Sequence, residues 1–127
     1  MALHIDLVTL VVAEYEPAIA FYTRAVGFDL IEDLDLGGGK RWVVVGPARG
    51  TRLLLARAVD AAQRAAIGHQ TGGRVGFFLE TDDFAAEHAR MAAAGVMFEE
   101  PPRHEPYGVV AVWRDPFGNR WDLIERA

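Results

Sequence analysis

The stretch Tyr107–Glu125, YGVVAVWRDPFGNRWDLIE, has the composition of two β-strands joined by a tight turn. Its first part, Val109–Trp113, consists of β-branched, small and aromatic residues, which suit a pleated and half-buried surface. Its last part, Arg120–Glu125, roughly alternates polar and apolar residues, as a strand with two different faces does. Between them, Asp115–Asn119 combines a carboxylate that can bind nearby amides, a proline with a preset φ and a glycine that tolerates positive φ. The stretch therefore predicts a β-hairpin.

The same order of strand, Pro/Gly turn and strand occurs upstream, at Arg41–Leu55. The turn prolines, Pro47 and Pro116, are 69 residues apart. The segments before the two hairpins match as well: Leu7–Val12 with a helix ending at Gly27, and Arg74–Glu80 with a helix ending at Gly95. The chain is therefore predicted to contain two copies of one unit, each roughly strand–helix–strand–strand–strand.

Length and composition limit the classes of function. The 127 residues suffice for one domain, and a hydrophobic content of 51% is ample for a core. The net charge is −5 and the basic residues are scattered, so no nucleic-acid partner is expected. Neither a long apolar run nor a leader-like start is present, so we expect no membrane partner and a cytoplasmic location. The absence of cysteine excludes disulfides, zinc–thiolate sites and cysteine nucleophiles.

The expected organisation is a single domain over residues 1–127, with module one at about 1–57, a linker at about 58–73 and module two at about 74–127. Within the linker, Asp60–Ile67 could form a short helix. The glycine-rich remainder, GHQTGG at residues 68–73, is typical of a loop.

Three segments resemble the vicinal oxygen chelate superfamily, the group of glyoxalases, bleomycin-resistance proteins and extradiol dioxygenases. They are VTLVV with AIAFYTRAVGF (residues 8–28), VGFFLETDDFAAEHARMAAAGV (residues 75–96) and the C-terminal hairpin. The resemblance implies an α+β fold of two βαβββ modules forming a curled mixed sheet around a cleft, usually in a homodimer. It does not by itself fix the chemistry, because one fold carries many functions. Members of the superfamily include lyases, isomerases, dioxygenases, thiol transferases and metal-free proteins that sequester drugs.

Metal-dependent members of this superfamily place ligands on the cleft-facing side of four strands. The matching positions here are Leu7, Leu54, Arg74 and Asp122. Leucine offers no lone pair and arginine no acceptor, so only Asp122 could bind a metal ion. We therefore predict no metal site of the usual kind and no cofactor.

The four histidines are poor candidates to replace the missing metal ligands. His4 should point to the other face of its strand, His88 lies within a predicted helix, and His69 and His104 lie in predicted loops. A nonstandard metal site that combines a loop histidine with Asp122 remains an alternative.

Strand alternation defines the predicted pocket. It carries three charged side chains among three apolar ones: Arg74, Asp122 and Glu80 with Leu7, Leu54 and Phe78. Arg74 either forms an ion pair with Asp122 or receives a carboxylate, phosphate or enolate oxygen of a ligand. In the second case Asp122 or Glu80 could act as a general base. Trp42 and Tyr107 are candidates for the pocket rim, because both enter strands beside loops, whereas Trp121 should pack under a helix.

The leading hypothesis is a metal-independent protein that holds a small organic ligand in its cleft, as bleomycin-resistance-type proteins do. The alternative is a glyoxalase-like lyase or isomerase, or a dioxygenase, with a nonstandard site around Arg74 and Asp122. A passive dimeric interaction module is a third possibility. The expected partners are a small organic ligand and a second copy of the chain.

Overall fold

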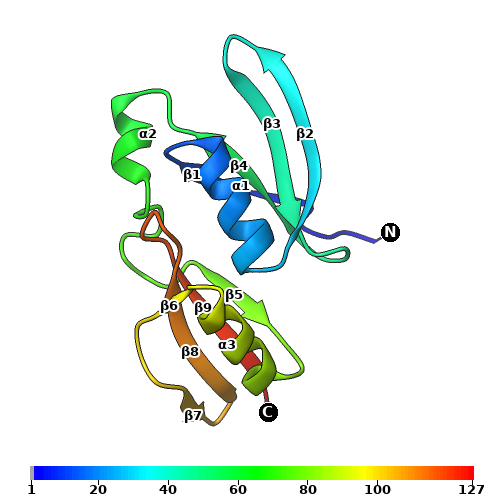
Figure 1. Ribbon diagram of the computed structural model, residues 1–127, viewed down its shortest axis with the longest axis vertical. Coiled ribbons are helices and arrows are strands. Elements are labelled where there is room, and N and C mark those ends of the chain that lie inside the picture. Colours follow the sequence, from blue (N-terminus) through cyan, green and yellow to red (C-terminus); the bar gives the residue numbers. More distant parts are fainter. Residues whose placement is uncertain (1) are drawn as a thin grey trace. The chain divides into compact units, whose positions relative to one another are not determined.

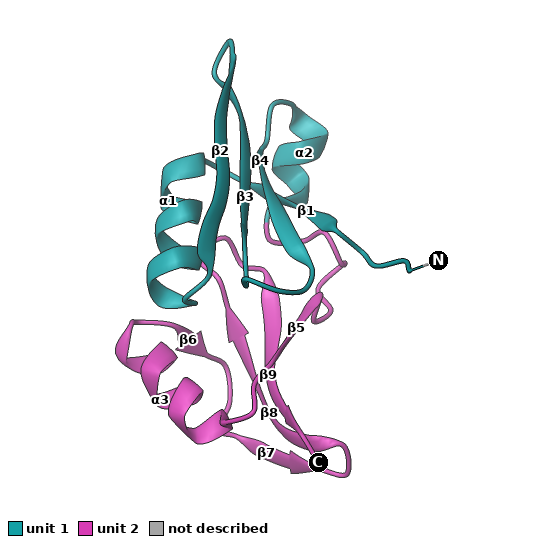
Figure 2. Cartoon of the chain, turned by 90° about the vertical axis from the view of Figure 1, so that its right-hand side faces the viewer, with its two compact units in different colours: residues 1–67 teal, residues 68–127 magenta. Residues whose placement is uncertain are grey.

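The computed structural model describes residues 2–127, which divide into two compact units. Unit 1 ends at Ile67 and unit 2 spans Gly68–Ala127, coloured teal and magenta in Figure 2. Each unit is a βαβββ-like module with its own mixed sheet, so the predicted fold class and the internal repeat are confirmed. No helix formed by residues 2–127 is long and apolar enough to cross a membrane.

Unit 1 forms a four-stranded sheet in the order β1-β4-β3-β2. Its strands and helices are β1 (Leu7–Val12), α1 (Tyr15–Ala20), the π-helical turn η1 (Phe21–Ala25), β2 (Asp29–Gly37), β3 (Lys40–Gly46), β4 (Arg52–Arg57) and α2 (Ala61–Ala66). β1 pairs with β4 in parallel, and the other two pairs are antiparallel (Figure 1). α2 lies within the predicted linker helix, and the carboxylate of Asp60 caps it by accepting from the Gln63 amide at 2.8 Å.

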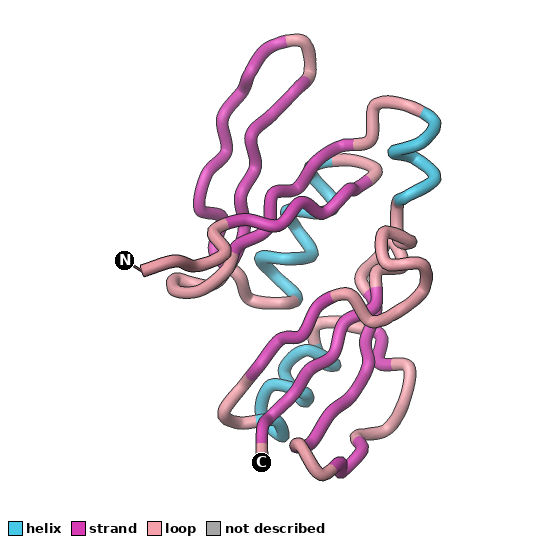
Figure 3. Tube along the Cα trace, turned by 180° about the vertical axis from the view of Figure 1, so that it is seen from behind, coloured by secondary structure: helices cyan, strands magenta, loops and turns pink. Residues whose placement is uncertain are grey.

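Unit 2 repeats this topology, with shorter first and second strands. Its elements are β5 (Phe77–Glu80), α3 (Phe84–Ala93), β6 (Met97–Phe98), β7 (Arg103–Glu105), β8 (Gly108–Arg114) and β9 (Arg120–Arg126). The sheet order is β5-β9-β8-β6, with β7 also paired to β8. As in unit 1, the first strand pairs with the last strand in parallel, and the remaining pairs are antiparallel (Figure 3).

The core of unit 1 lies between its sheet and α1. The face of the sheet toward α1 carries the fully buried side chains Leu10, Val12, Val43, Val45 and Leu55. Ala18 of α1 and Tyr22 of η1 complete this core. Burying these apolar surfaces is the main favourable contribution to folding. Alternation and strand register place Thr9, Trp42 and Leu54 on the opposite face.

In unit 2 the corresponding core contains stacked aromatic rings. Trp121 stacks on Trp113 with centroids 4.9 Å apart and on Phe77 at 4.8 Å. α3 packs against β9 and buries Phe84 and Met91. The prediction that Trp121 lies on the helix side of its strand is confirmed, because Glu125, on the same face of β9, accepts from the Phe84 amide at the start of α3 at 2.7 Å.

The hairpin β8–β9 has the predicted turn chemistry. One carboxylate oxygen of Asp115 accepts from the amides of Phe117 and Asn119, at 2.9 and 2.8 Å. The other accepts from the Asn119 side chain at 2.7 Å. Gly118 takes the positive φ of +100° that a side chain would disfavour. These bonds fix the turn and, with it, the register of β8 against β9.

One predicted boundary is wrong. The second module was expected to open with a strand over Arg74–Glu80, but β5 begins at Phe77. Gly72 and Gly73 have positive φ, and the Thr71 hydroxyl donates to the Arg74 carbonyl at 2.6 Å. Arg74 is therefore held in a turn, and the local hydrogen bond outweighs its place in an otherwise strand-like pattern.

Candidate functional site

A cavity of about 510 Å³ in unit 1 contains two of the residues predicted to contact a ligand. Trp42 and Leu54 line it together with Leu36 and Ala56. The register Leu34–Trp42 and Val44–Leu54 places these side chains on the face of the sheet opposite α1. Leu36 is 53% and Trp42 36% exposed. This part of unit 1 thus offers an accessible apolar and aromatic surface.

Polar contacts hold the rim of this cavity. The indole N–H of Trp42 donates to Glu32 Oε2 at 2.9 Å, which fixes the plane of the ring. The Tyr15 hydroxyl accepts from the Arg41 amide at 3.0 Å, and the guanidinium groups of Arg41 and Arg57 lie over the Tyr15 ring. The cavity therefore has an apolar wall and a polar rim, in which Arg41 is paired with Glu16 and Asp33, and Arg57 with Glu14.

Asp122 is the most unusual polar residue of unit 2. It is 7% exposed, on the face of the sheet opposite α3, and its Oδ1 is buried without a hydrogen-bond partner among residues 2–127. Burial raises its pKa because the charged form loses water, the nearby Arg103 opposes this, and Glu100 adds to it. A raised pKa and an unsatisfied oxygen are features of carboxylates that transfer protons or bind a ligand.

Ion pairs surround Asp122 on this face. The carboxylate of Glu99 accepts from both Arg114 and Arg120, with an Arg120 Nη2–Oε2 distance of 2.9 Å. The Arg120 hydrogen bond is the main reason that the pKa of Glu99 is lowered. Nearby, Arg103 bridges Glu100 at 2.9 Å and Glu105 at 2.6 Å.

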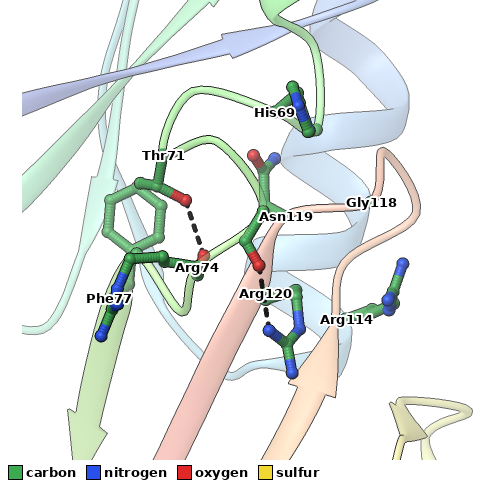
Figure 4. A pocket seen from close by; sticks show the side chains of 11 residues that line it. His69, Thr71, Arg74, Phe77, Arg114, Gly118, Asn119 and Arg120 are labelled. Atoms are coloured by element: carbon green, nitrogen blue, oxygen red, sulfur yellow. Dashed lines mark hydrogen bonds between the residues drawn. The ribbon is translucent and has the colours of Figure 1, made fainter.

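The predicted ion pair between Arg74 and Asp122 is not present among residues 2–127. The cationic neighbours of Asp122 are Arg103 and Arg120, which come from β7 and β9. Arg74 instead lines a second cavity, beside the loop that precedes β5 (Figure 4). The side chain was misplaced because the strand in which it was expected starts three residues later.

The other predicted site residues lie at different depths. Leu7 is half-buried in β1, opposite Arg52. Phe78 is 63% exposed and pairs with Asp122 across β5 and β9. Glu80 is exposed and forms an ion pair with Arg126 at 2.9 Å.

Tyr107 is half-exposed in the turn between β7 and β8, near Arg103. Sequence alternation thus brings Phe78, Glu80 and Asp122 to one face of unit 2 and Trp42 with Leu54 to one face of unit 1.

The residues at the family's metal positions do not fit a metal ion. Leu7 and Leu54 provide no donor atom, and Arg74 provides no acceptor. Within residues 2–127 no group of three or more His, Asp or Glu side chains is arranged to hold a metal ion. His88 lies within α3, where its ring stacks on Phe84 and contacts Phe98 at 4.1 Å between ring centroids, and these contacts account for the burial of its Nε2.

The family model of the Glyoxalase/Bleomycin resistance protein/Dioxygenase superfamily matches residues 4–123. The chain belongs to this superfamily. A curated relative, an uncharacterized protein of Shewanella frigidimarina (strain NCIMB 400), is 49% identical and covers 93% of this chain and 90% of its own length. YetH of Bacillus subtilis (strain 168) is 26% identical over 98% of this chain and its full length.

Solved structures of other proteins share this fold. UcmS2 is 30% identical, with a TM-score of 0.83 and coverage of 98% of both chains. TnmS3, an antibiotic binding protein from Streptomyces sp. CB03234, is 33% identical, with a TM-score of 0.80 and coverage of 100% of this chain and 99% of its own. The superfamily resemblance inferred from the three sequence segments is confirmed.

Sequence reasoning missed Glu99, which joins Arg114 to Arg120. Part of this cluster could have been predicted, because the register of the hairpin places Arg114 opposite Arg120. The chain between β6 and β7 is irregular, however, and gives no pattern from which the position of Glu99 could be derived.

Proposed function

We propose that this protein binds a small organic molecule without a metal ion, using the apolar and aromatic surface around Trp42 and Leu54. The observation that carries the proposal is the cavity of about 510 Å³, a size typical of small-molecule sites. The ring of Trp42 is both partly exposed and held by Glu32, which suits stacking on a planar group.

Two further points support this function. At the family's metal positions this chain has Leu7, Leu54 and Arg74, none of which can coordinate a metal ion, and Leu54 lines the cavity instead. TnmS3, a binding protein for an antibiotic, shares the fold over the whole chain at 33% identity. The class of ligand we favour is therefore a planar aromatic natural product.

The test is a panel of antibiotics that carry a planar aromatic group, bleomycin included, measured by the shift in melting temperature and by quenching of tryptophan fluorescence. A binder should raise the melting temperature, since a ligand at a hundredfold excess over Kd stabilises the fold by about 2.7 kcal/mol. Trp42→Ala should remove both the quenching and most of the affinity. Leu3→Ala is the control, because Leu3 is exposed and lies outside the cavity. A panel without a hit, or equal affinity of Trp42→Ala and wild type, would refute the proposal.

A second candidate function is a glyoxalase-like lyase or isomerase in which Asp122 transfers a proton. The observation that favours it is the buried and unpartnered Oδ1 with its raised pKa. Hemithioacetals of methylglyoxal are suitable first substrates. Asp122→Asn should abolish the turnover, and full activity of this variant would rule out the mechanism.

We further propose that both modules act together as one domain and that the protein is a homodimer. The resemblance to the superfamily supports this assembly. Light scattering coupled to size-exclusion chromatography should give a mass of twice 14.0 kDa. A monomeric mass over the full concentration range would contradict the proposal.

A further inference from the structure

The second cavity, of about 280 Å³, lies at the end of the unit 2 sheet between the loop Gly68–Gly76 and the β8–β9 turn (Figure 4). We call it the loop pocket. Its charged and polar lining consists of His69, Thr71, Arg74, Arg114, Asn119 and Arg120. No carboxylate of the described residues lines it. A protein with a net charge of −5 thus has a local cluster of positive charge at this place.

The loop around this pocket is tightly held. A Cβ atom on Gly68 would lie 2.0 Å from the Phe117 carbonyl oxygen, so the backbone here approaches the turn as closely as only glycine allows. A Cβ on Gly76 would lie 2.7 Å from Thr71. Arg120 donates to the Gly73 carbonyl at 3.0 Å and accepts at its own carbonyl from the Gly76 amide at 3.0 Å. The pocket is therefore a built feature of the fold.

The three arginines of the loop pocket differ in their partners. Arg114 and Arg120 share the single carboxylate of Glu99, so this cluster keeps an excess of positive charge. The guanidinium of Arg74 forms no ion pair with any residue from 2 to 127, and the side chain is exposed. An uncompensated guanidinium beside two others raises the local potential and attracts anions.

We propose that the loop pocket binds an oxyanion, the phosphate or carboxylate group of a small molecule, with Arg74 as its principal contact. Guanidinium groups bind both of these anions through paired and charge-assisted hydrogen bonds. His69 provides a further polar group at the same cavity. This site goes beyond the proposed function, because it involves unit 2 residues only and does not depend on an organic ligand at Trp42.

The test is a titration with inorganic phosphate and, separately, with benzoate, followed by amide NMR at constant ionic strength set with sodium chloride. Constant ionic strength matters because salt screens exposed charges. Saturable shifts are expected for amides of residues 68–76 and 114–120. Tighter binding of phosphate would identify a phosphorylated ligand, and tighter binding of benzoate a carboxylated one. If neither anion gives saturable shifts there, the proposal is overturned.

Two variants and one control sharpen the test. Arg74→Gln removes the principal contact and should weaken anion binding about tenfold. Glu99→Gln keeps an acceptor for Arg114 and Arg120 but raises the charge of the cluster by one, so it should tighten binding. Arg49→Gln removes an exposed arginine of unit 1 and should change nothing. Equal effects of Arg74→Gln and Arg49→Gln, or weaker binding by Glu99→Gln, would refute the site, whatever the outcome of the fluorescence assay at Trp42.

Discussion

The rings of Trp113 and Trp121 stack across the β8–β9 pair, with centroids 4.9 Å apart and planes at 16°. Both side chains are almost fully buried, and Phe77 continues the stack on the other side of Trp121. This arrangement fixes the register of β5, β9 and β8, since a slip of one of these strands by one residue would turn its ring to the opposite face.

Trp121→Ala should therefore lower the free energy of unfolding by about 3–5 kcal/mol, because it removes a large buried side chain and leaves a cavity. Urea unfolding followed by circular dichroism measures this loss. Trp42→Ala is the matched control, since this ring is partly exposed, and it should cost no more than about 1 kcal/mol. Similar losses for both variants would contradict the role of the stack.

Asp122 should make the protein less stable as the pH rises. Its pKa in the folded state is raised, so the folded state binds more protons than the unfolded one between the ordinary value of about 3.9 and the raised value. In that window the free energy of unfolding falls with increasing pH, and the loss persists above it. Asp122→Asn cannot ionise and should abolish this decrease. Urea unfolding at a series of pH values would show it, and an unchanged pH profile of the variant would contradict the burial of the charge.

Glu99 should have the opposite effect and make the protein more stable as the pH rises. Its pKa is lowered by Arg120 and Arg114, so its contribution is present above the ordinary pKa of about 4.3 and is lost as the pH falls through the folded-state value. Glu99→Gln should thus be less stable than wild type at neutral pH, and the difference should vanish in acid. The exposed Asp82→Asn is the control. A stability difference that is constant with pH would exclude the ion pairs as its cause.

Gly68→Ala should be much more destabilising than Gly72→Ala. Both glycines have positive φ, +70° and +68°, so an alanine at either place costs about 1–2 kcal/mol of backbone strain. Only at Gly68 does the new methyl group also meet the Phe117 carbonyl, which adds about 1–3 kcal/mol, whereas at Gly72 it points into open space. Melting temperatures of the two variants give the comparison. Equal shifts would show that the loop at residues 68–76 does not pack closely against the β8–β9 turn.

The sequence was sufficient for the elements with strong local signals. The Asp115–Asn119 turn, the positive φ of Gly27 and Gly95 after the helices, and the side of β9 on which Trp121 lies all follow from turn chemistry, capping and alternation. These rules act over a few residues, so a single sequence contains the information that they need.

The features that could not be predicted from the sequence depend on longer-range or competing contacts. Arg74 was assigned to a strand, and a hydrogen bond from Thr71 holds it in a turn instead. Asp122 was placed on the correct face, but its buried Oδ1 depends on how the segment around Glu100 and Arg103 covers the sheet. No periodicity encodes such packing.

The parallel pairing of first and last strands also constrains the order of folding. Leu7 pairs with Arg52, and Phe77 pairs with Trp121, so each sheet closes only after its whole module has been synthesised. The segment between the first and the last strand of each sheet is long. Bringing its two ends together costs conformational entropy before the new strand contacts compensate for that cost. On the ribosome, β5 therefore has no partner in its own sheet until β9 emerges, and during that interval the exposed edge of β5 is open to pairing with other chains.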